Sequence, residues 1–459
     1  MTTSGSTPPW STTPLALALA AAVALVAPLA VAGAQSPPRG AGRAAPAASA
    51  CRPAPAPDAA PPTAAFAYDR AAPLALRDSL EGVARGVAVY RVSFDSPKGG
   101  RATGMLHVPV DTLRARTGGA DGRLAGVVML HGAPGDARGM EFAVRPIAEA
   151  GAVVLTLDAP FARRDPRAPL AFTPQDSVDL VQHVVDLQRA VDVLVARADV
   201  DPARLAGMGI SHGGSVGALL AGVERRLKAY ALAVADGGAA AHFTLPNGAR
   251  MPTPAGTDAA AWCAWYSAME PLAATRFVAR AAPAELLFLW GRQDPMVRPR
   301  LAEGLWRAAS APKTARWYGT GHSLPHASGD DVRAWLAARI GIVAPPAFRG
   351  RAAELVGTYA GWGGQRDALE LRVTLADTLG NLGLLGPLTG PEDPTGRMRY
   401  LGATSAGEAF QLDDKKLTFV RTDGRVTALH LDAPIDDPRF HLELARMPAS
   451  APTASAADR

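Results

Sequence analysis

The sequence predicts an α/β fold with a mostly parallel sheet, followed by a smaller antiparallel β domain. Two patterns support this prediction. Between about residues 125 and 340, short apolar stretches alternate with segments of helical character, which is the rhythm of parallel strands joined by crossover helices. After Pro345-Pro346, short alternating stretches are separated by turn residues, which is typical of an antiparallel barrel or sandwich of about 100 residues.

The α/β part is expected to begin with a hairpin, since residues 90–94 and 106–108 alternate on either side of the turn at Lys98-Gly99-Gly100. Further strands are expected near residues 125–130, 152–157, 204–209, 229–235, 284–290 and 314–318. One helix is well defined, because apolar side chains recur at four-three spacing from Leu180 to Leu194. Thr173, Pro174 and Asp176 supply its N-terminal signals.

A G-x-S-x-G sequence, Gly209-Ile210-Ser211-His212-Gly213, stands between an expected strand and a helix of small residues. A serine on so sharp a turn has a strained backbone, and side chains two residues before or after it would collide. Glycines at 209 and 213 remove those side chains. The context predicts Ser211 as an exposed nucleophile, whereas a GxGxxG dinucleotide loop fits less well because His212 takes the place of its last glycine.

An acid and a base follow in the chain order Ser, Asp, His. Asp294 follows the expected strand at 284–290, and His322 follows the one at 314–318. A serine hydroxyl needs an imidazole to take its proton, and the imidazole needs a carboxylate to fix its tautomer. We therefore expect the triad Ser211, Asp294 and His322, with His326 as an alternative base and Asp236 as an alternative acid.

Two backbone amides are expected to bind the oxyanion. One is that of His212, directly after the nucleophile, and the second is that of Ala133, with Gly132 as its neighbour. Loss of one such donor typically costs about 3 kcal/mol of transition-state stabilisation. His131, in the same loop, is interpreted as a residue that orients the loop.

Five stretches, VVMLHGAPG, VVLTLDAPFARR, VDPARLAGMGISHGG, AELLFLWGRQDPMV and GTGHSLP, give residues 125–325 a resemblance to the α/β-hydrolase superfamily. Within it the chain looks like dienelactone-hydrolase-related esterases and acyl-peptidase-like enzymes. The resemblance implies an α/β-hydrolase fold, the triad named above, and the His212 and Ala133 amides as oxyanion hole. Dienelactone hydrolase has a cysteine at the elbow, so its lactone specificity does not carry over to Ser211.

These observations predict a serine hydrolase whose partner is a small-molecule ester. A peptidase or amidase of the acyl-peptidase type is the alternative, disfavoured because no propeller-like domain precedes the elbow. A binding protein built on the same scaffold is a third hypothesis, disfavoured because every triad position is occupied.

The insert between residues 235 and 284 holds Trp262, Trp265, Tyr266 and Met269, which form either a wall of the substrate pocket or a core stripe of a helix. Arg163 and Arg164 either line the pocket mouth or are solvated surface charge.

Composition excludes several other classes. The chain has 459 residues, 48% hydrophobic, with a formal net charge of +5 and nine histidines. The arginines are scattered without a basic stripe interleaved with aromatic residues, which argues against nucleic-acid binding. The histidines show neither H-E-x-x-H nor Cys/His spacing, so neither a metal nor a cofactor is expected. The sequence leaves the oligomeric state open.

The N-terminus predicts export. An apolar run ends in Ala32-Gly33-Ala34, an A-x-A-like cleavage site, so residues 1–34 are expected to be a signal peptide. An uncleaved anchor is the alternative, because no Lys or Arg precedes the run, but its alanines and Pro28 disfavour a stable membrane span after processing. Residues 35–65 are rich in Pro and Ala and are expected to be a linker before a catalytic domain at 66–343.

The sequence leaves open whether the two cysteines, Cys51 and Cys263, pair, with pairing disfavoured. An exported protein permits a disulfide, but Cys51 lies in a Pro/Ala tract in which nothing positions it.

The β domain is expected over residues 350–448, followed by a disordered tail at 449–459. Expected strands there lie at 355–359, 369–373, 417–420, 426–431 and 440–444, with a turn at Thr422-Asp423-Gly424. It resembles the small lipocalin-like domain behind the catalytic domain of some secreted serine hydrolases. A packing or assembly role is favoured over ligand binding.

Overall fold

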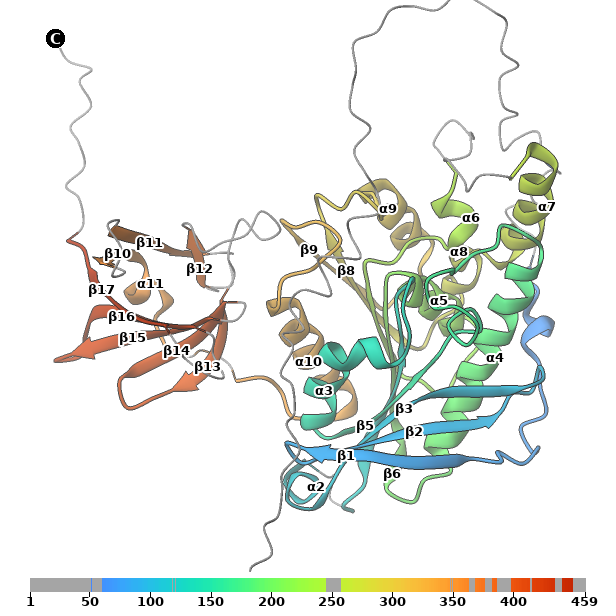
Figure 1. The fold of residues 1–459 in the computed structure, drawn as a ribbon, viewed down its shortest axis with the longest axis horizontal. Helices are drawn as coiled ribbons and strands as arrows, with labels where there is room; N and C mark the ends of the chain where they lie inside the picture. Colours follow the sequence, from blue (N-terminus) through green and yellow to red (C-terminus); the bar gives the residue numbers. More distant parts are fainter. Residues whose placement is uncertain are drawn as a thin grey trace, which may run out of the picture. The chain divides into compact units, whose positions relative to one another are not determined.

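The computed structural model describes residues 51, 60–117, 119, 121–244, 257–346, 348, 350–362, 368–375, 382–385, 398–412, 415–433 and 440–448. The predicted signal peptide, most of the predicted linker and the predicted disordered tail lie outside the described residues. Two sheets organise the rest, and we call residues 60–346 the α/β domain and residues 350–448 the β domain (Figure 1).

The α/β domain is built on a sheet of nine strands in the order β1-β2-β3-β5-β4-β6-β7-β8-β9. The strands are β1 Arg77–Ala84, β2 Val87–Asp95, β3 Arg101–Pro109, β4 Leu124–Leu130, β5 Ala152–Leu157, β6 Val200–Ile210, β7 Ala229–Ala233, β8 Glu285–Gly291 and β9 Lys313–Tyr318. The first three pair antiparallel, as does β3 with β5, and all neighbours from β5 to β9 are parallel. The chain passes from β4 to β5 on one side and returns to β6 on the other, so β4 and β6 flank a topological switch point where α/β folds form their sites.

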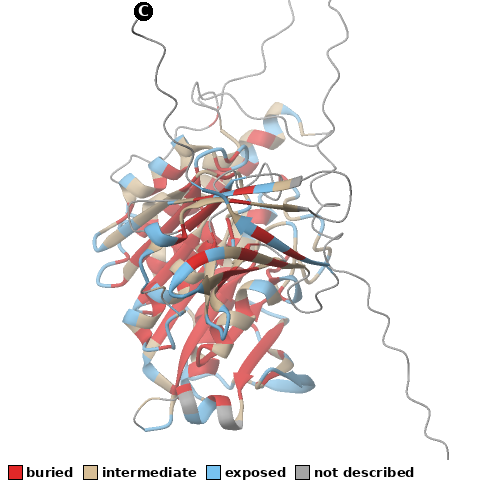
Figure 2. Cartoon of the chain, turned by 90° about the vertical axis from the view of Figure 1, so that its left-hand side faces the viewer, coloured by how far each residue is buried: buried red, intermediate tan, exposed pale blue. Residues whose placement is uncertain are grey.

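Helices cover both faces of this sheet. They are α2 Asp111–Thr117, α3 Glu141–Glu149, α4 Gln175–Val195, α5 His212–Ala221, α6 Ala239–His242, α7 Ala259–Met269, α8 Ala274–Val278, α9 Pro299–Ala308 and α10 Ala327–Ile340, with short 3-10 turns at Thr63–Phe66, Arg138–Met140 and Glu270–Leu272. One apolar core lies against α4, α5, α8 and α9, and a second against α3 and α10. Every residue of β4 and β5 is buried. Both faces of these strands are covered, which explains why their sequences are almost continuously apolar. Figure 2 shows that buried residues gather in the strands inside the molecule.

The predicted hairpin and parallel strands are confirmed, whereas β1 was not predicted. All eight of its residues are exposed, so this edge strand has no alternation of apolar and polar residues to mark it. The residues expected to cap the N-terminus of α4 do not cap it. The helix begins after Pro174 without a side-chain cap, and Asp176 instead accepts hydrogen bonds from the amides of Ala171 and Phe172 and from Trp265 Nε1.

The β domain contains α11 Ala352–Leu355 and one antiparallel sheet in the order β12-β11-β10-β17-β16-β15-β14-β13. Its strands are β10 Gly357–Trp362, β11 Ala368–Leu375, β12 Leu382–Leu385, β13 Arg399–Ala403, β14 Gly407–Leu412, β15 Lys415–Thr422, β16 Arg425–Ala433 and β17 Phe440–Arg446. The Met398 amide, next to β13, donates to the Leu382 carbonyl in β12 at 2.9 Å, so the two edges of the sheet approach each other. A single curved sheet favours the predicted barrel over the sandwich.

Three strands of the β domain, β12 to β14, were not predicted, since they are short and lack a clear alternation. The predicted turn between β15 and β16 is confirmed. Asp423 and Gly424 have φ of +51° and +78°, the left-handed conformation that a two-residue hairpin turn requires.

Cys51 and Cys263 form a disulfide, the alternative that the sequence left open but disfavoured. Cys51 is buried in a cluster with Phe172, Trp262 and Trp265, and these aromatic residues supply the packing that its own sequence neighbours lack. A separation of 212 residues hid this contact from the sequence. In the described part of the chain, no helix combines the length and hydropathy needed to span a bilayer.

We expect the double variant Cys51→Ser/Cys263→Ser to lose about 2–5 kcal/mol of unfolding free energy, because the disulfide closes a long loop in the unfolded chain. Urea denaturation of the oxidised protein measures this loss. Dithiothreitol should lower the midpoint of the wild type and leave that of the double variant unchanged. Equal midpoints for oxidised wild type and variant would contradict the expectation.

Candidate active site

Ser211 occupies a sharp turn between β6 and α5. Its φ of +56° and ψ of −120° are a conformation that residues with a side chain rarely adopt. The Ser211 amide donates to the Ala233 carbonyl at 2.9 Å, and α5 begins at the next residue. The parallel sheet, its helices and this strand-turn-helix serine together decide the fold. The α/β domain has the α/β-hydrolase fold.

Glycines permit this turn because backbone segments meet there without space for side chains. A Cβ on Gly209 would lie 2.3 Å from the Gly213 carbonyl oxygen, and one on Gly213 would lie 2.3 Å from that of Leu130. The second contact also brings the end of β4 against the first turn of α5. The loop that follows β4 therefore lies beside Ser211.

A chain of hydrogen bonds links the three predicted triad residues. His322 Nε2 lies 3.0 Å from Ser211 Oγ, and His322 Nδ1 lies 2.8 Å from Asp294 Oδ2. The other oxygen of the buried Asp294 carboxylate accepts from the amides of Met296 and Val297 at 2.8 and 2.9 Å. A carboxylate only accepts, so Nδ1 carries the proton and Nε2 is left to accept the Ser211 hydroxyl.

The loops that carry the acid and the base are fastened to each other. The Gln293 amide donates to the Thr320 carbonyl at 2.9 Å, and a Cβ on Gly291 would lie 2.0 Å from the Gly321 carbonyl oxygen. This close backbone contact fixes the separation of the Asp294 and His322 side chains.

His131 orients the loop after β4, as interpreted from the sequence. Its Nε2 accepts from the Ala159 amide at 2.9 Å, so Nδ1 is the protonated nitrogen that donates to the Gly132 carbonyl at 2.7 Å. Burial lowers the pKa of His131 and keeps the ring neutral. A Cβ on Gly132 would lie 3.7 Å from Ser211 Cβ. Within the described residues, the amides of Ala133 and His212 have no protein acceptor.

The alternative acid and base are placed differently. Asp236 accepts from Ser215 Oγ at 3.0 Å and pairs with His242 Nδ1 at 2.7 Å, so its carboxylate serves another imidazole than His322. His326 directly precedes α10, and the imidazole in contact with Ser211 Oγ is that of His322.

The sequence did not predict the pairing of His242 with Asp236, because a histidine six residues after an aspartate matches no known motif. Burial opposes protonation of His242, but the hydrogen bond and charge of Asp236 outweigh it and raise its pKa.

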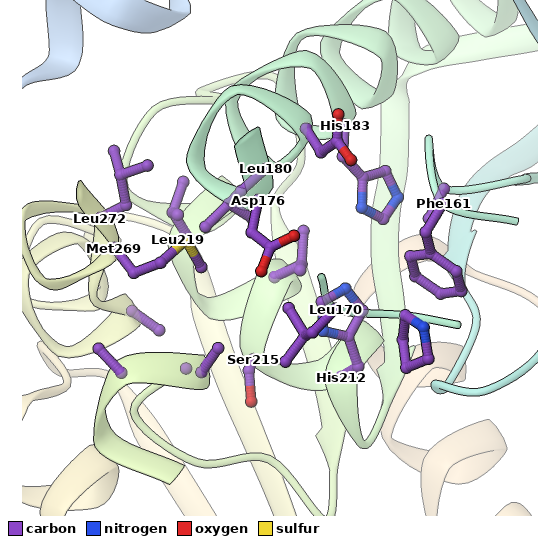
Figure 3. Close-up of a pocket in the computed structure, with 18 of the residues that line it drawn as sticks. Phe161, Leu170, Asp176, Leu180, His183, His212, Ser215, Leu219, Met269 and Leu272 are labelled. Atoms are coloured by element: carbon purple, nitrogen blue, oxygen red, sulfur yellow. The ribbon is translucent and has the colours of Figure 1, made fainter. Parts of the chain in front are cut away.

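A small pocket, partly open to solvent, lies against the first turns of α5 (Figure 3). Its apolar lining includes Leu170, Leu180, Val216, Leu219, Met269 and Leu272. Its polar lining includes His183, His212 and Ser215 together with the carboxylates of Asp176 and Asp179. His212, the residue after the nucleophile, contributes to this lining, whereas Ser211, Asp294 and His322 do not.

The predicted aromatic wall divides into two roles. Trp262 and Trp265 are buried against Phe172 and Cys51, which is the core alternative, whereas Met269 lines the pocket. Arg163 pairs with the buried carboxylate of Asp186 at 2.6 Å rather than facing the pocket. Arg164 pairs with Asp179, which does line it.

The buried imidazoles of His131 and His183 and the half-buried imidazole of His212 lie close together beside this pocket. The His183 and His212 rings are 6.2 Å apart and nearly parallel, and His131 lies 6.4 Å from His183. Burial, reinforced by the neighbouring imidazoles, lowers the pKa of His212 to about 4 and that of His183 well below its usual range. Both rings are therefore neutral at neutral pH. In the described part of the chain His183 Nε2 has no hydrogen-bond partner.

No family model and no curated protein matches this chain. Among solved structures, it is similar to an acetyl xylan esterase from Paenibacillus sp. R4, at 18% identity and a TM-score of 0.47, with 58% of this chain and 89% of that chain covered. It is also similar to acetyl xylan esterase 1 from Thermoanaerobacterium sp. JW/SL YS485, at 13% identity and a TM-score of 0.44, with 60% and 91% covered. Because these identities are so low, the acetyl xylan in the two names is a substrate of those proteins and is not assigned to this chain.

We expect Gly213→Ala to destabilise the protein by about 1–3 kcal/mol, because the added methyl group would overlap backbone atoms that cannot move aside. Gly329→Ala is the matched control, since that glycine lies in α10 and a Cβ added to it would meet no atom within 4 Å. The control should be neutral or stabilising by up to about 1 kcal/mol. Thermal unfolding measures both, and equal effects would show that the turn tolerates a side chain.

Proposed function

We propose that this chain is a serine hydrolase that cleaves carboxylic esters by acyl transfer. The observation that carries the proposal is the hydrogen-bond chain from Ser211 Oγ through His322 to Asp294, at 3.0 and 2.8 Å. These are the contacts that a nucleophile, its general base and the orienting carboxylate need.

In the first half of the reaction, His322 Nε2 takes the Ser211 hydroxyl proton as Oγ attacks the ester carbonyl carbon. The imidazolium then gives this proton to the departing alkoxide, and the acyl group stays on Ser211. In the second half, His322 takes a proton from water, the hydroxide attacks the acyl carbon, and Ser211 leaves with the proton returned by His322. Asp294 stays ionised throughout and stabilises the imidazolium.

The tetrahedral intermediates place a negative charge on the former carbonyl oxygen. In the proposal, the amides of His212 and Ala133 donate to this oxygen. Two observations support the assignment: Gly132 lies beside Ser211, and neither amide has an acceptor among the described residues. Donors fixed by backbone need no reorganisation as the charge develops, which makes them effective.

The pocket beside α5 is proposed to take the acyl group. It is lined mainly by aliphatic side chains, and His212, which directly follows the nucleophile in the chain, is one of its lining residues. Because His183 and His212 are neutral, the pocket presents no imidazolium charge to an acyl chain at neutral pH. We expect an uncharged acyl chain to bind there, since aliphatic side chains predominate in the lining.

A peptidase or amidase remains the alternative, since the same catalytic groups serve both bonds. Nitrophenyl esters of increasing acyl length, assayed beside aminoacyl nitroanilides, separate the two. Faster hydrolysis of the nitroanilides would replace the ester proposal.

Export is also part of the proposal. The Cys51–Cys263 disulfide supports it, because such bonds persist in oxidising compartments and are rare in the cytosol. Mass spectrometry of the mature protein tests export. A chain that begins at Gln35 would support the proposed signal peptide, and a chain that begins at Met1 would argue against it.

Ser211→Ala should lower turnover by at least about 10⁴-fold, because the triad acts as a unit. His322→Ala should be as damaging, for the same reason. His326→Ala is the matched control and should be nearly silent. Ester hydrolysis by purified, folded variants is the measurement. Retained activity in Ser211→Ala would remove the nucleophile assignment, and the opposite ranking of the histidines would move the base.

Leu180→Trp should reduce kcat/KM for a hexanoyl ester at least about tenfold more than for an acetyl ester, since Leu180 lines the pocket and the larger side chain would fill part of it. Val178→Trp is the matched control, because Val178 lies on the same helix, is exposed and does not line the pocket. If Leu180→Trp affects both esters equally, the acyl chain binds elsewhere.

A further inference from the structure

Four titratable side chains gather on one face of the β16–β17 ladder in the β domain. His430 lies directly opposite Glu443, and Asp432 directly opposite His441. The intervening Leu429, Leu431, Leu442 and Leu444 are buried in the core of the domain. Because side chains alternate along a strand, the four polar residues all lie on the outer face.

Two imidazoles and a carboxylate converge there. Glu443 Oε1 lies 3.6 Å from His430 Nε2 and 3.7 Å from His441 Nε2. The ligand atoms of the three residues all lie within 4.8 Å of one another. Ligand atoms of a tetrahedral ion with bonds of about 2.0–2.1 Å are separated by about 3.4 Å, so small side-chain rotations suffice.

The fourth residue sets the tautomer of one imidazole. His441 Nδ1 lies 2.6 Å from Asp432 Oδ1. The carboxylate accepts, so Nδ1 carries the proton, and in the neutral ring Nε2 is left to bind an ion. A carboxylate behind a histidine in this way is the usual arrangement around a metal-bound imidazole.

We propose that His430, His441 and Glu443 bind one divalent transition-metal ion of the Zn²⁺ type, with Asp432 positioning His441. Two imidazoles and one carboxylate suit such ions, whereas Ca²⁺ and Mg²⁺ require mainly oxygen ligands. Three protein ligands leave at least one coordination position for water. The site lies in the β domain and is independent of the proposed esterase activity.

The sequence did not predict this site. His430-x-Asp432 and His441-x-Glu443 match no metal-binding spacing, and only the register of β16 and β17 brings the two pairs together. As a set of ion pairs alone, the cluster would contribute little to stability, because Glu443 is 69% exposed and His441 52%.

Titration of the full-length, tag-free and chelator-treated protein with ZnCl₂ in a calorimeter tests the proposal. One ion should bind, and Co²⁺ in its place should give the visible absorption of a tetrahedral site. His441→Ala should abolish this absorption. Asp432→Asn should weaken Zn²⁺ binding about 10–100-fold while leaving all three ligands in place.

Glu443→Gln and Glu370→Gln form a matched pair, since both glutamates are exposed on β strands of the same domain and only Glu443 belongs to the cluster. Glu443→Gln should weaken binding at least about tenfold, and Glu370→Gln should leave it unchanged. Circular dichroism checks that each variant is folded. No Zn²⁺ binding by the wild type, or binding that the His441, Glu443 and Asp432 variants leave unchanged, would overturn the proposal.

Discussion

The backbone contact between β4, β6 and α5 is the constraint on which the site depends. Gly213 lies so close to the Leu130 carbonyl that no side chain fits between them, and Ser211, two residues earlier in the same turn, has a positive φ. The strained residue is held by its surroundings, through the hydrogen bond to Ala233 and the start of α5. The position of the hydroxyl is thus set by backbone packing, and the imidazole and carboxylate are brought to it by loops at the ends of β8 and β9.

The fold could be predicted where local pattern and packing agree. Parallel strands buried on both faces read as apolar runs, and the glycines around Ser211 are a direct consequence of the turn. The chain order of Asp294 and His322 was informative because both follow neighbouring parallel strands, whose carboxyl ends meet at one edge. The structure brings these three residues together at hydrogen-bonding distance, and their catalytic role stays a proposal.

What sequence could not supply was contact between distant segments. The exposed strand β1 and the short strands β12 to β14 lack alternation, so no periodicity marked them. The sequence around His183 in α4 carries no functional motif, and only the fold brings its ring next to that of His212. Pairing of Cys51 was disfavoured because its sequence neighbours gave it no packing, yet the aromatic residues of α7 and Phe172 provide that packing.

The disulfide divides the covalent chain unequally with respect to the candidate site. Residues 51 to 263 form a closed ring that contains Ser211 and both proposed oxyanion amides, whereas Asp294 and His322 lie on the open arm that follows. In the unfolded, oxidised protein the nucleophile is therefore held in a covalent macrocycle, and the acid and base are free of it. Pairing of β8 with β7, together with packing of α8 against α5 and of α10 against α3 and β6, joins the two parts, so the site is complete only when this later arm has docked onto the ring.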